Sequence, residues 1–563
     1  MFQKHEKTLR EAVEALHSRG YWSAYPEIPS GKIYGENARA EGAAAYEALL
    51  GKPFVLPSHP GHGTAGQEVS PYGGALSVRY PAATADELLV CSRAAAGAWA
   101  SCSIRRRAGI CLEILDRLNQ RSFLMANAVM NTSGQAFPMA FQAGGPHAQD
   151  RGLEAVARAW VEMMAVPAQV QWRKPAGRGQ EIVLEKHWRV IPRGVSLVVG
   201  CQTFPTWNSY SGLFSSLVTG NTVIAKPHPM AILPMAITVA VAREVLQEAG
   251  LPMDIVLLGA EDEGGTLAAR LATDSRVALI DYTGSTAFGQ WLRDHAATPL
   301  VFTEETGVNT IVLGATDDFQ GMCDNIAFSL ALYSGQMCTA PQNVYLPRSG
   351  IETDVGHRTF DEVAQAISSA IDEVLGDPGR AAQIAGAIAN PATLERIASA
   401  RCLGRVIRES SQLDVQGART ATPLLLAVDG DTAPSSAGSD DVPHERECFG
   451  PIAFLIAAEN ADAAIRAASE LAKRKGAITA ALYDTDHDRI ERAIAAFADA
   501  GVNLSINLTG NVYVNQSAAF SDFHGTGANP AGNASLTDGA FVASRFRTVM
   551  WRRSVSDEPE ASS

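Results

Sequence analysis

The chain has 563 residues, several times the usual single-domain length, so the sequence predicts two or three domains that each bury a full core. Hydrophobic residues make up 46% of the chain and charged residues 19%, as in ordinary globular proteins. The formal net charge of -14 argues against a nucleic-acid partner. Because no apolar run reaches the roughly 18 residues needed to cross a bilayer, we expect no membrane association.

The first 22 residues have heptad-like apolar spacing and mixed charges, without the basic start and apolar core of an export signal. The eight cysteines are scattered, with neither CxxC pairs nor histidines at zinc spacing. These features predict a cytoplasmic protein without a metal site.

From about residue 196, short β-rich runs alternate with helical stretches. The runs are SLVVG, NTVIAKP, DIVLLGA, VALIDYTG and PLVFTEE, and helices are expected over 231–249, 264–272 and 285–296. This alternation is typical of right-handed βαβ crossovers. The sequence therefore predicts a doubly wound parallel sheet.

A second α/β segment begins at NTIVLG, residues 309–314. It includes helical stretches around 323–333 and 360–375, followed by the β-rich runs FLIAAE, ITAALYD and VNLSINL. A second, separate sheet is expected.

Residues 169–194 form two alternating runs across a Gly-Arg-Gly turn, which predicts a hairpin that stands out from the first domain. An exposed hairpin edge needs a partner strand. Near the C-terminus, AFVASRFRTVMWRR alternates like a strand, and the polar tail SVSDEPEASS after it is expected to be disordered.

Four segments fall where open α/β sheets bind ligands, at the carboxyl ends of strands. KPHP, residues 226–229, offers a lysine to a nucleotide's ribose or phosphate, and TGSTAFG, residues 283–289, offers backbone N–H groups and a helix dipole to an anion. Both have structural alternatives, since the lysine could cap carbonyls and Gly-Ser-Thr is also a plain helix N-cap.

The other two segments carry reactive groups. Glu304 and Glu305 offer a carboxylate that a partly apolar cleft could turn into a general base, although a solvated loop glutamate is commoner. Cys338, in SGQMCTAP, lies at a bend beside a helix end, where a thiolate could be stabilised. Residue type alone favours a buried structural cysteine. The order of the four segments, however, suits an oxidoreductase that uses covalent catalysis.

These motifs resemble those of the aldehyde dehydrogenase superfamily, and the resemblance covers roughly residues 70–551. The stretch Gly335 to Cys338 matches the family's GQxC, which implies that Cys338 is the nucleophile. With Glu304 as the general base, Gly307 and Asn309 fall in register without a gap, whereas Glu305 would need a deletion. The separation 338 − 304 = 34 is the family's customary spacing.

The resemblance also implies a nicotinamide dinucleotide cofactor. The residues that would bind it include the ribose lysine and the pyrophosphate turn. In the family's ExFGP, the Glu would hold the nicotinamide ribose and the Phe would pack near the ring. The matching residues are Lys226, then Gly284, Ser285 and Gly289, then Glu447 and Phe449.

Two departures from the family pattern bear on activity. TFP replaces the usual NFP, so Thr203 stands where an Asn amide helps to hold the oxyanion, and either the Thr203 hydroxyl or Asn208 would have to substitute. Pro229 stands where NAD-preferring members often carry Glu. With His228 close by, NADP or NAD is expected, with NADP slightly favoured.

The fold that the resemblance implies is α/β and aldehyde dehydrogenase-like, with an oligomerisation arm made of the hairpin and the C-terminal strand. Residues 1–303 would form an N-terminal helical extension and the NAD(P)-binding domain, including the 169–194 hairpin. Residues 304–515 would form the catalytic domain, and residues 516–563 would return to the cofactor domain, add the strand and end in the tail. A homodimer or homotetramer is expected.

The implied reaction is NAD(P)-dependent oxidation of an aldehyde to a carboxylic acid through a cysteine thiohemiacetal and thioester. TFPTWN, KPHP, TEETGVN and SDFHGTGANPAGNASLTD look most like members that act in phenylacetic acid degradation, which implies a semialdehyde substrate, with a CoA-thioester semialdehyde as one candidate. A CoA-acylating dehydrogenase and a catalytically weak scaffold are the alternatives. His524 is a candidate substrate contact, although a structural loop histidine is commoner.

Overall fold

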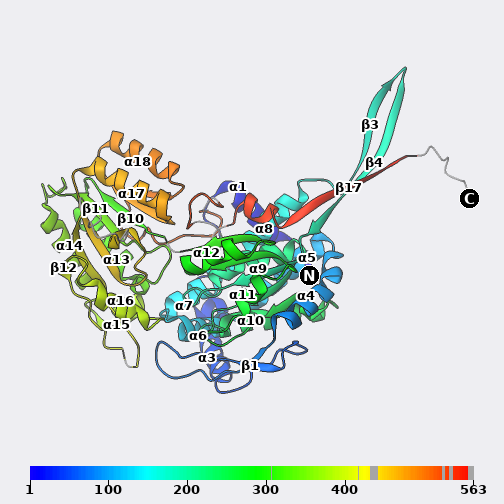
Figure 1. The fold of residues 1–563 in the computed structure, drawn as a ribbon, viewed down its shortest axis with the longest axis horizontal. Coiled ribbons are helices and arrows are strands. Elements are labelled where there is room, and N and C mark those ends of the chain that lie inside the picture. The colour runs from blue at the N-terminus through cyan, green and yellow to red at the C-terminus, as the bar shows by residue number, and fades with distance from the viewer. Residues whose placement is uncertain (306, 416, 431–441, 523–525, 532–536, 556–563) are drawn as a thin grey trace, which may run out of the picture.

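The computed structural model describes residues 1–555 except 306, 416, 431–441, 523–525 and 532–536. Two lobes lie side by side, one built on a five-stranded sheet and the other on a seven-stranded sheet, and a long β-ribbon projects from the first lobe (Figure 1). Within the described residues, no helix combines the length and the apolar character that a membrane crossing requires.

The first sheet is parallel throughout and has the order β7-β6-β5-β8-β9. The chain leaves β5 towards β6 and β7 on one side and continues with β8 and β9 on the other, so the strand order reverses beside β5 and opens a crevice at the carboxyl ends. The doubly wound prediction is confirmed. The strands are β5 (Val195–Val199), β6 (Thr222–Lys226), β7 (Val256–Leu258), β8 (Val277–Thr283) and β9 (Leu300–Glu304).

Helices cover both faces of this sheet. One face packs against α9 (Trp207–Val218) and α10 (Leu233–Glu248), and the other packs against α4 (Ala85–Ala100), α11 (Leu267–Ala272) and α12 (Thr286–His295). The helix expected over 264–272 starts later, because Gly264 has a positive φ of 79° and precedes the turn into α11.

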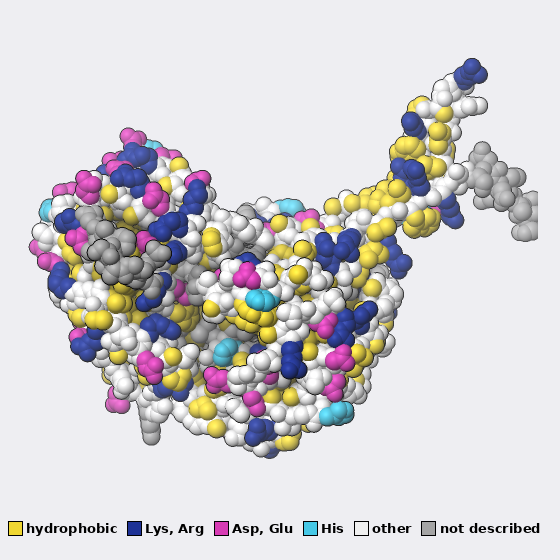
Figure 2. Space-filling view, in the orientation of Figure 1, with side chains coloured by type: hydrophobic (Ala, Val, Ile, Leu, Met, Phe, Trp, Pro, Cys, Tyr) yellow, Lys and Arg dark blue, Asp and Glu magenta, His cyan; other side chains and the backbone are white. Residues whose placement is uncertain are grey.

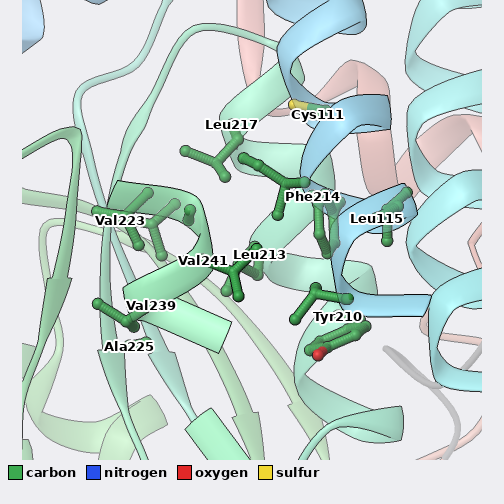
Figure 3. Close-up of a cluster of buried hydrophobic side chains, with 14 of the residues drawn as sticks. Cys111, Leu115, Tyr210, Leu213, Phe214, Leu217, Val223, Ala225, Val239 and Val241 are labelled. Atoms are coloured by element: carbon green, nitrogen blue, oxygen red, sulfur yellow. The ribbon is translucent and has the colours of Figure 1, made fainter. Parts of the chain in front are cut away.

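The core under α9 fixes the helix that begins beside the strand ends. Leu213, Phe214 and Leu217 of α9 are at most 1% exposed and pack between β6 and α5 (Ile104–Gln120), whose Leu115 is also fully buried (Figure 3). Close packing of this kind resists displacement of the backbone. The first turn of α9 is therefore held rigidly at the mouth of the crevice.

The second sheet has the order β12-β13-β14-β11-β10-β15-β16 and is parallel except for the β12–β13 pair. The predicted strands at 309–314 and in the three later runs are confirmed, whereas the sequence did not indicate β11, β12 and β13. The strands are β10 (Thr310–Leu313), β11 (Asn343–Pro347), β12 (Arg405–Arg408), β13 (Leu424–Asp429), β14 (Ile452–Ala458), β15 (Thr479–Tyr483) and β16 (Asn503–Ile506).

Helices also cover both faces of the second sheet. They are α13 (Phe319–Ala331), α14 (Phe360–Val374) and α15 (Pro378–Ala385) on one face, and α16 (Ala392–Ala400), α17 (Ala461–Lys475) and α18 (His487–Asp499) on the other. β9 of the first sheet ends at Glu304 and β10 of the second begins at Thr310. The domain divisions at 303/304 and 515/516 stay a prediction.

The projecting ribbon contains the predicted hairpin and the C-terminal strand. β4 (Gln180–Pro192) is the central strand, and it pairs antiparallel with β3 (Gln169–Gly177) on one edge and with β17 (Phe546–Ser554) on the other. Figure 2 shows that the ribbon stands clear of the body and carries apolar and basic side chains along its length. The sequence predicted both the hairpin and its partner strand, whereas the tail from 556 lies outside the described residues.

The N-terminal part wraps the first lobe with helices and one small hairpin. These are α1 (Phe2–Ser18), α2 (Gly31–Tyr34), α3 (Ala38–Glu47), α6 (Ser122–Ser133), α7 (Phe137–Gly144) and α8 (Pro146–Met164), with β1 (Gly63–Ala65) pairing β2 (Tyr80–Ala82). The remaining short elements are η1 (Met253–Ile255), η2 (Leu332–Gly335), η3 (Pro443–Glu445) and α19 (Gly539–Ala543).

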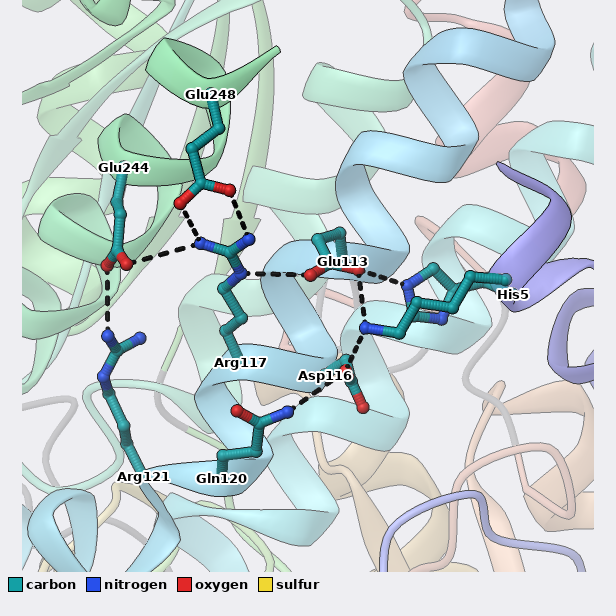
Figure 4. Close-up of polar contacts among 9 residues, drawn as sticks. His5, Glu113, Asp116, Arg117, Gln120, Arg121, Glu244 and Glu248 are labelled. Carbon is teal, nitrogen blue, oxygen red and sulfur yellow. Dashed lines mark hydrogen bonds and ion pairs between the residues drawn. The ribbon is translucent and has the colours of Figure 1, made fainter. Parts of the chain in front are cut away.

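A charge network joins α1 to α5 and α10, with Glu113 at its centre (Figure 4). The Glu113 carboxylate accepts from Lys4 Nζ at 2.9 Å, His5 Nε2 at 2.7 Å and Arg117 Nε at 3.0 Å. Burial alone would raise the pKa of Glu113, but these three donors outweigh it and lower the pKa to about 2. The network therefore ties the N-terminal helix to the first lobe.

We predict that Glu113→Gln lowers the free energy of unfolding by about 1–3 kcal/mol at pH 7, because three donors lose a charged acceptor. The folded pKa lies below the ordinary 4.5, so the contribution is present above pH 4.5 and is lost as the pH falls towards 2. Urea unfolding at pH 7 and pH 3 measures this, with exposed Glu6→Gln as the matched control. An equal loss at both pH values would contradict the prediction.

Candidate active site

A cavity of about 580 Å³ lies at the carboxyl ends of the first sheet, and residues of both lobes line it. It brings together eleven of the residues that the sequence indicated: Thr203, Asn208, Lys226, His228, Pro229, Gly284, Ser285, Glu304, Cys338, Glu447 and Phe449. Gly289 is buried beneath it and does not line it. His524 lies outside the described residues.

The turn before Cys338 needs a glycine. After α13 the backbone passes through Tyr333 and Ser334, which both have φ of 50°, to Gly335 at 63°. A Cβ on Gly335 would lie 2.4 Å from the carbonyl oxygen of Gly450, so no larger residue fits. Gln336, which is 1% exposed, donates to the Tyr333 and Ala387 carbonyls and accepts from the Ala389 N–H at 2.8 Å.

Asn309 holds the backbone of Cys338 itself. Its Nδ2 donates to the carbonyls of Cys338 at 2.7 Å and Ala340 at 2.9 Å, while its Oδ1 accepts from the Ile478 and Thr479 N–H groups. One buried amide therefore connects the nucleophile loop to the start of β15. Asn309 belongs to the sequence motif that contains the proposed general base, Glu304. Its side chain, however, positions the backbone of Cys338 and not Glu304.

Glu304 is the last residue of β9, and its side chain, 1% exposed, faces Cys338. Its Oε1 accepts from Asn208 Nδ2 at 3.1 Å, and its carboxylate lies beside the Cys338 thiol and raises the pKa of that thiol. Its backbone carbonyl accepts from the Gly284 N–H at 3.0 Å. The Asn208 amide and the hydrogen-bonded end of the strand therefore place the carboxylate beside the thiol.

Glu305 points elsewhere. Its carboxylate forms an ion pair with Arg293 of α12, and it packs on Gly289, where a Cβ would lie 2.3 Å from Glu305 Oε1. The ion pair and the packing on Gly289 direct the Glu305 carboxylate towards α12 rather than towards the Cys338 thiol. The geometry thus supports the choice of Glu304 over Glu305 and gives Gly289 a packing function.

The thiol of Cys338 is protonated at neutral pH. Burial, then the neighbouring Glu304, Cys201 and Glu447, raise its pKa well above the ordinary 9.0. The bend therefore does not favour the thiolate, contrary to the expectation from its position beside a helix end, because desolvation and nearby carboxylates oppose ionisation. Glu304 is the group placed to receive the proton.

The two candidate oxyanion donors, Thr203 and Asn208, are already engaged. One Asn208 N–H is directed to Glu304, and its Oδ1 accepts from the Cys201 thiol at 3.5 Å. The Thr203 hydroxyl lies 3.9 Å from the Cys201 sulfur, and its carbonyl accepts from Gln135 Nε2 at 2.7 Å. Cys201 thus lies among the catalytic candidates. It could not be indicated from the sequence, because it falls within no motif.

At the end of β6, Lys226 forms an ion pair with Glu261, whose Oε1 lies 2.6 Å from the lysine Nζ. His228 lines the same end of the cavity, and burial together with the Lys226 charge lowers its pKa to about 4, so it is neutral at pH 7. Glu261 was not indicated by the sequence, because it lies in an unremarkable acidic loop after β7.

The anion-binding turn opens α12. Ser285 is its N-cap, and the Ser285 carbonyl accepts from the Tyr282 hydroxyl at 2.9 Å. The backbone N–H groups of the first turn and the helix dipole face the cavity end lined by Gly284, Ser285 and Phe288. This arrangement suits a pyrophosphate.

Glu447 and Phe449 line the cavity from the second lobe. Burial raises the pKa of Glu447 to about 8, although an N–H from Gly307 opposes the shift. The Phe449 carbonyl accepts from Arg396, a residue of α16 that also lines the cavity and that the sequence did not indicate. A buried carboxyl at the cavity wall suits a ligand that offers hydroxyl groups.

The model of the aldehyde dehydrogenase family matches residues 60–539. The chain therefore belongs to the aldehyde dehydrogenase family and is an oxidoreductase that acts on aldehydes.

Three known proteins illustrate the similarity. A crystal structure of an NAD-dependent aldehyde dehydrogenase from Burkholderia multivorans is 52% identical, covers 99% of both chains and has a TM-score of 0.95. The N-succinylglutamate 5-semialdehyde dehydrogenase of Burkholderia ambifaria is 25% identical over 403 residues, which are 69% of this chain and 75% of that protein. A 1-pyrroline-5-carboxylate dehydrogenase from Thermus thermophilus, 18% identical with a TM-score of 0.74 over 95% of this chain and 99% of the other, shares the fold.

We predict that alkylation of Cys338 by iodoacetamide accelerates about tenfold per pH unit between pH 7 and 9, because only the thiolate reacts. Glu304→Gln should react faster than the parent protein at pH 8, since it removes a negative charge that raises the thiol pKa. Quantifying the alkylated Cys338 peptide by mass spectrometry measures both. Glu305→Gln is the matched control and should leave the rate unchanged. A rate plateau below pH 8, or slower alkylation of Glu304→Gln, would contradict the prediction.

Proposed function

We propose that the enzyme oxidises an aldehyde to a carboxylic acid with NAD or NADP, using Cys338 as the nucleophile and Glu304 as the general base. The observation that carries the proposal is the buried Glu304 carboxylate beside the Cys338 thiol, inside a cavity that also offers Lys226, Ser285 and Glu447. These residues suit a dinucleotide, because a cation, a helix N-terminus and a buried carboxyl match ribose and phosphate chemistry. When bound, the dinucleotide supplies a hydride acceptor.

In the first half of the reaction, the Cys338 sulfur bonds to the aldehyde carbon while its proton passes to Glu304, which releases it to solvent before the second half. The carbonyl π electrons move to oxygen, and the candidate donors to this oxyanion are the Cys338 N–H together with either Thr203 or Asn208. Loss of hydride from the carbon then leaves a thioester on Cys338.

In the second half, Glu304 removes a proton from water. The water oxygen bonds to the thioester carbon, the carbon–sulfur bond breaks, and the carboxylic acid leaves as the sulfur regains a proton. Retention of a buried glutamate beside the thiol supports hydrolysis over transfer to coenzyme A. A catalytically weak scaffold is the remaining alternative, and Thr203 in place of the usual Asn is what favours it.

For the substrate, we propose a semialdehyde of phenylacetate or related aromatic-acid catabolism, on the resemblance of TFPTWN, KPHP and TEETGVN to the phenylacetic acid degradation protein PaaN. Phe204 and Cys201 line the cavity and belong to a buried apolar cluster, which supports an aromatic or apolar aldehyde. The cluster comprises Ala143, Phe204 and Tyr333, with Met139, Cys201, Trp207 and Met337 packed against it. The relatives named N-succinylglutamate 5-semialdehyde dehydrogenase make an acidic aliphatic semialdehyde the second candidate.

We also propose a homodimer or homotetramer joined through the ribbon, because Trp551 is 50% exposed and Val549 is 54% exposed on its outer strand. Size-exclusion chromatography with light scattering tests the assembly, and a monomer would contradict it.

A cytoplasmic location agrees with the eight free cysteines, which a reducing compartment preserves.

The expected NADP preference rested on Pro229 and His228. It loses support because His228 is neutral and because Glu261 brings a carboxylate to Lys226. We therefore propose NAD as the preferred cofactor.

Glu304→Gln should keep the amplitude of the initial burst of reduced cofactor close to one equivalent per active site, because Cys338 can still lose its proton to solvent. Turnover should then slow by at least about 100-fold, because hydrolysis loses its base. Thr203→Val should instead slow the burst itself by about tenfold or more, since it removes a hydroxyl donor without changing shape. Stopped-flow absorbance at 340 nm without coenzyme A separates the two effects. Acid release that requires coenzyme A, or full activity of Cys338→Ala, would contradict the scheme.

The proposed substrate class predicts a higher kcat/KM for aromatic than for dicarboxylate-derived aldehydes, by at least about tenfold, because an apolar wall binds an anion poorly. A panel of phenylacetaldehyde, an aromatic-acid-derived semialdehyde, succinate semialdehyde and N-succinylglutamate 5-semialdehyde measures this. Preference for the last two would favour the second candidate.

A further inference from the structure

Glu261 lies in the loop between β7 and α11 and is held in a defined position. Its Oε1 is 2.6 Å from Lys226 Nζ, and its Oε2 accepts from the Leu267 N–H at 2.8 Å. A Cβ on Gly265 would lie 2.2 Å from Glu261 Oε2, so the loop has a glycine where the carboxylate folds against it. The Glu261 side chain is 12% exposed and the Lys226 side chain 6%.

This pair lines one end of the cavity together with residues that leave room for a ligand. The surrounding wall consists of His228, Pro229, Gly264, Gly265 and Ala268. β6 and β7 are adjacent parallel strands, so their carboxyl ends bring Lys226 and the Glu261 loop to the same edge of the sheet. In doubly wound folds this edge binds the adenosine half of a dinucleotide.

The charges at this end are balanced without a ligand. Lys226 is neutralised by Glu261, and burial lowers the pKa of His228 to about 4, so the histidine adds no charge at pH 7. Among the described residues that line the cavity, the only other cation is Arg396, which belongs to α16 and contacts the Phe449 carbonyl. A 2'-phosphate at Lys226 would therefore meet a carboxylate and no second cation.

We propose that Glu261 selects NAD over NADP by accepting from the 2'-hydroxyl of the adenosine ribose beside Lys226 and by repelling a 2'-phosphate at that position. This inference rests on the proposed function, since it assigns the adenosine end of the same cofactor cavity. A carboxylate that accepts from the ribose is the usual determinant of NAD binding, whereas a 2'-phosphate requires an added cation. In this chain, the carboxylate comes from Glu261 in the loop after β7, the strand next to β6, because position 229 is a proline.

The test is equilibrium binding of NAD and NADP by isothermal titration calorimetry, with no aldehyde present, so that turnover is not the readout. The parent protein should bind NAD at least about tenfold more tightly than NADP, because like charges brought together in a cavity are strongly unfavourable. Glu261→Gln keeps an acceptor oxygen for Leu267 and removes the charge. It should reduce the ratio of the two dissociation constants by at least about tenfold, mainly by tightening NADP.

Glu263→Gln is the matched control, because Glu263 is an exposed glutamate in the same loop that does not line the cavity. It should leave the ratio unchanged, and thermal unfolding of both variants verifies that they are folded. An unchanged ratio in Glu261→Gln, or tighter binding of NADP than of NAD by the parent protein, would overturn this inference alone. Failure of the parent protein to bind either dinucleotide would overturn the cofactor assignment and this inference with it.

Discussion

The contact between the Glu304 carboxylate and the Cys338 thiol is the constraint on which the rest of the site depends. Glu304 ends a strand of the first sheet, and Cys338 follows a left-handed turn of the second lobe, so the contact exists only when the two lobes meet in one relative position. Asn208 fixes the carboxylate from α9, and Asn309 fixes the cysteine backbone. Burial and the neighbouring carboxylates make the thiol a weak acid, so its reactivity depends on the loss of its proton, and Glu304 is placed beside it to take part in that transfer.

The charged residues of the cavity differ between its two ends, one near Lys226 and the other near the Cys338 thiol. At the Lys226 end, the lysine is paired with Glu261 and His228 is neutral, so no uncompensated cation is present there to hold a phosphate. At the reacting end, carboxyl groups of Glu304 and Glu447 lie near the thiol. The first arrangement suits recognition of a hydroxyl, and the second suits proton movement.

The strands of the first sheet were predictable, because buried β-rich runs alternate with helices at regular intervals. Glu304 could be chosen over Glu305 by counting to Cys338, and the Arg293–Glu305 ion pair supplies the physical reason. Glu261 was not predictable, because its contact with Lys226 spans 35 residues (261 − 226) and exists only through the pairing of β6 with β7. The raised pKa of Cys338 was also beyond the sequence, since it depends on burial and on neighbours brought together by folding.

The C-terminal segment closes the first lobe. Arg545 is fully buried against Asp281 at 2.8 and 2.5 Å, and β17 covers the open edge of β4, more than 350 residues earlier in the chain. During synthesis on the ribosome, Asp281 therefore lacks its Arg545 partner, and the edge of β4 stays uncovered, until the whole second lobe has been made. Unpaired edges promote association with other chains. The order of translation thus makes the half-made protein, rather than the finished one, the species most in need of chaperone protection.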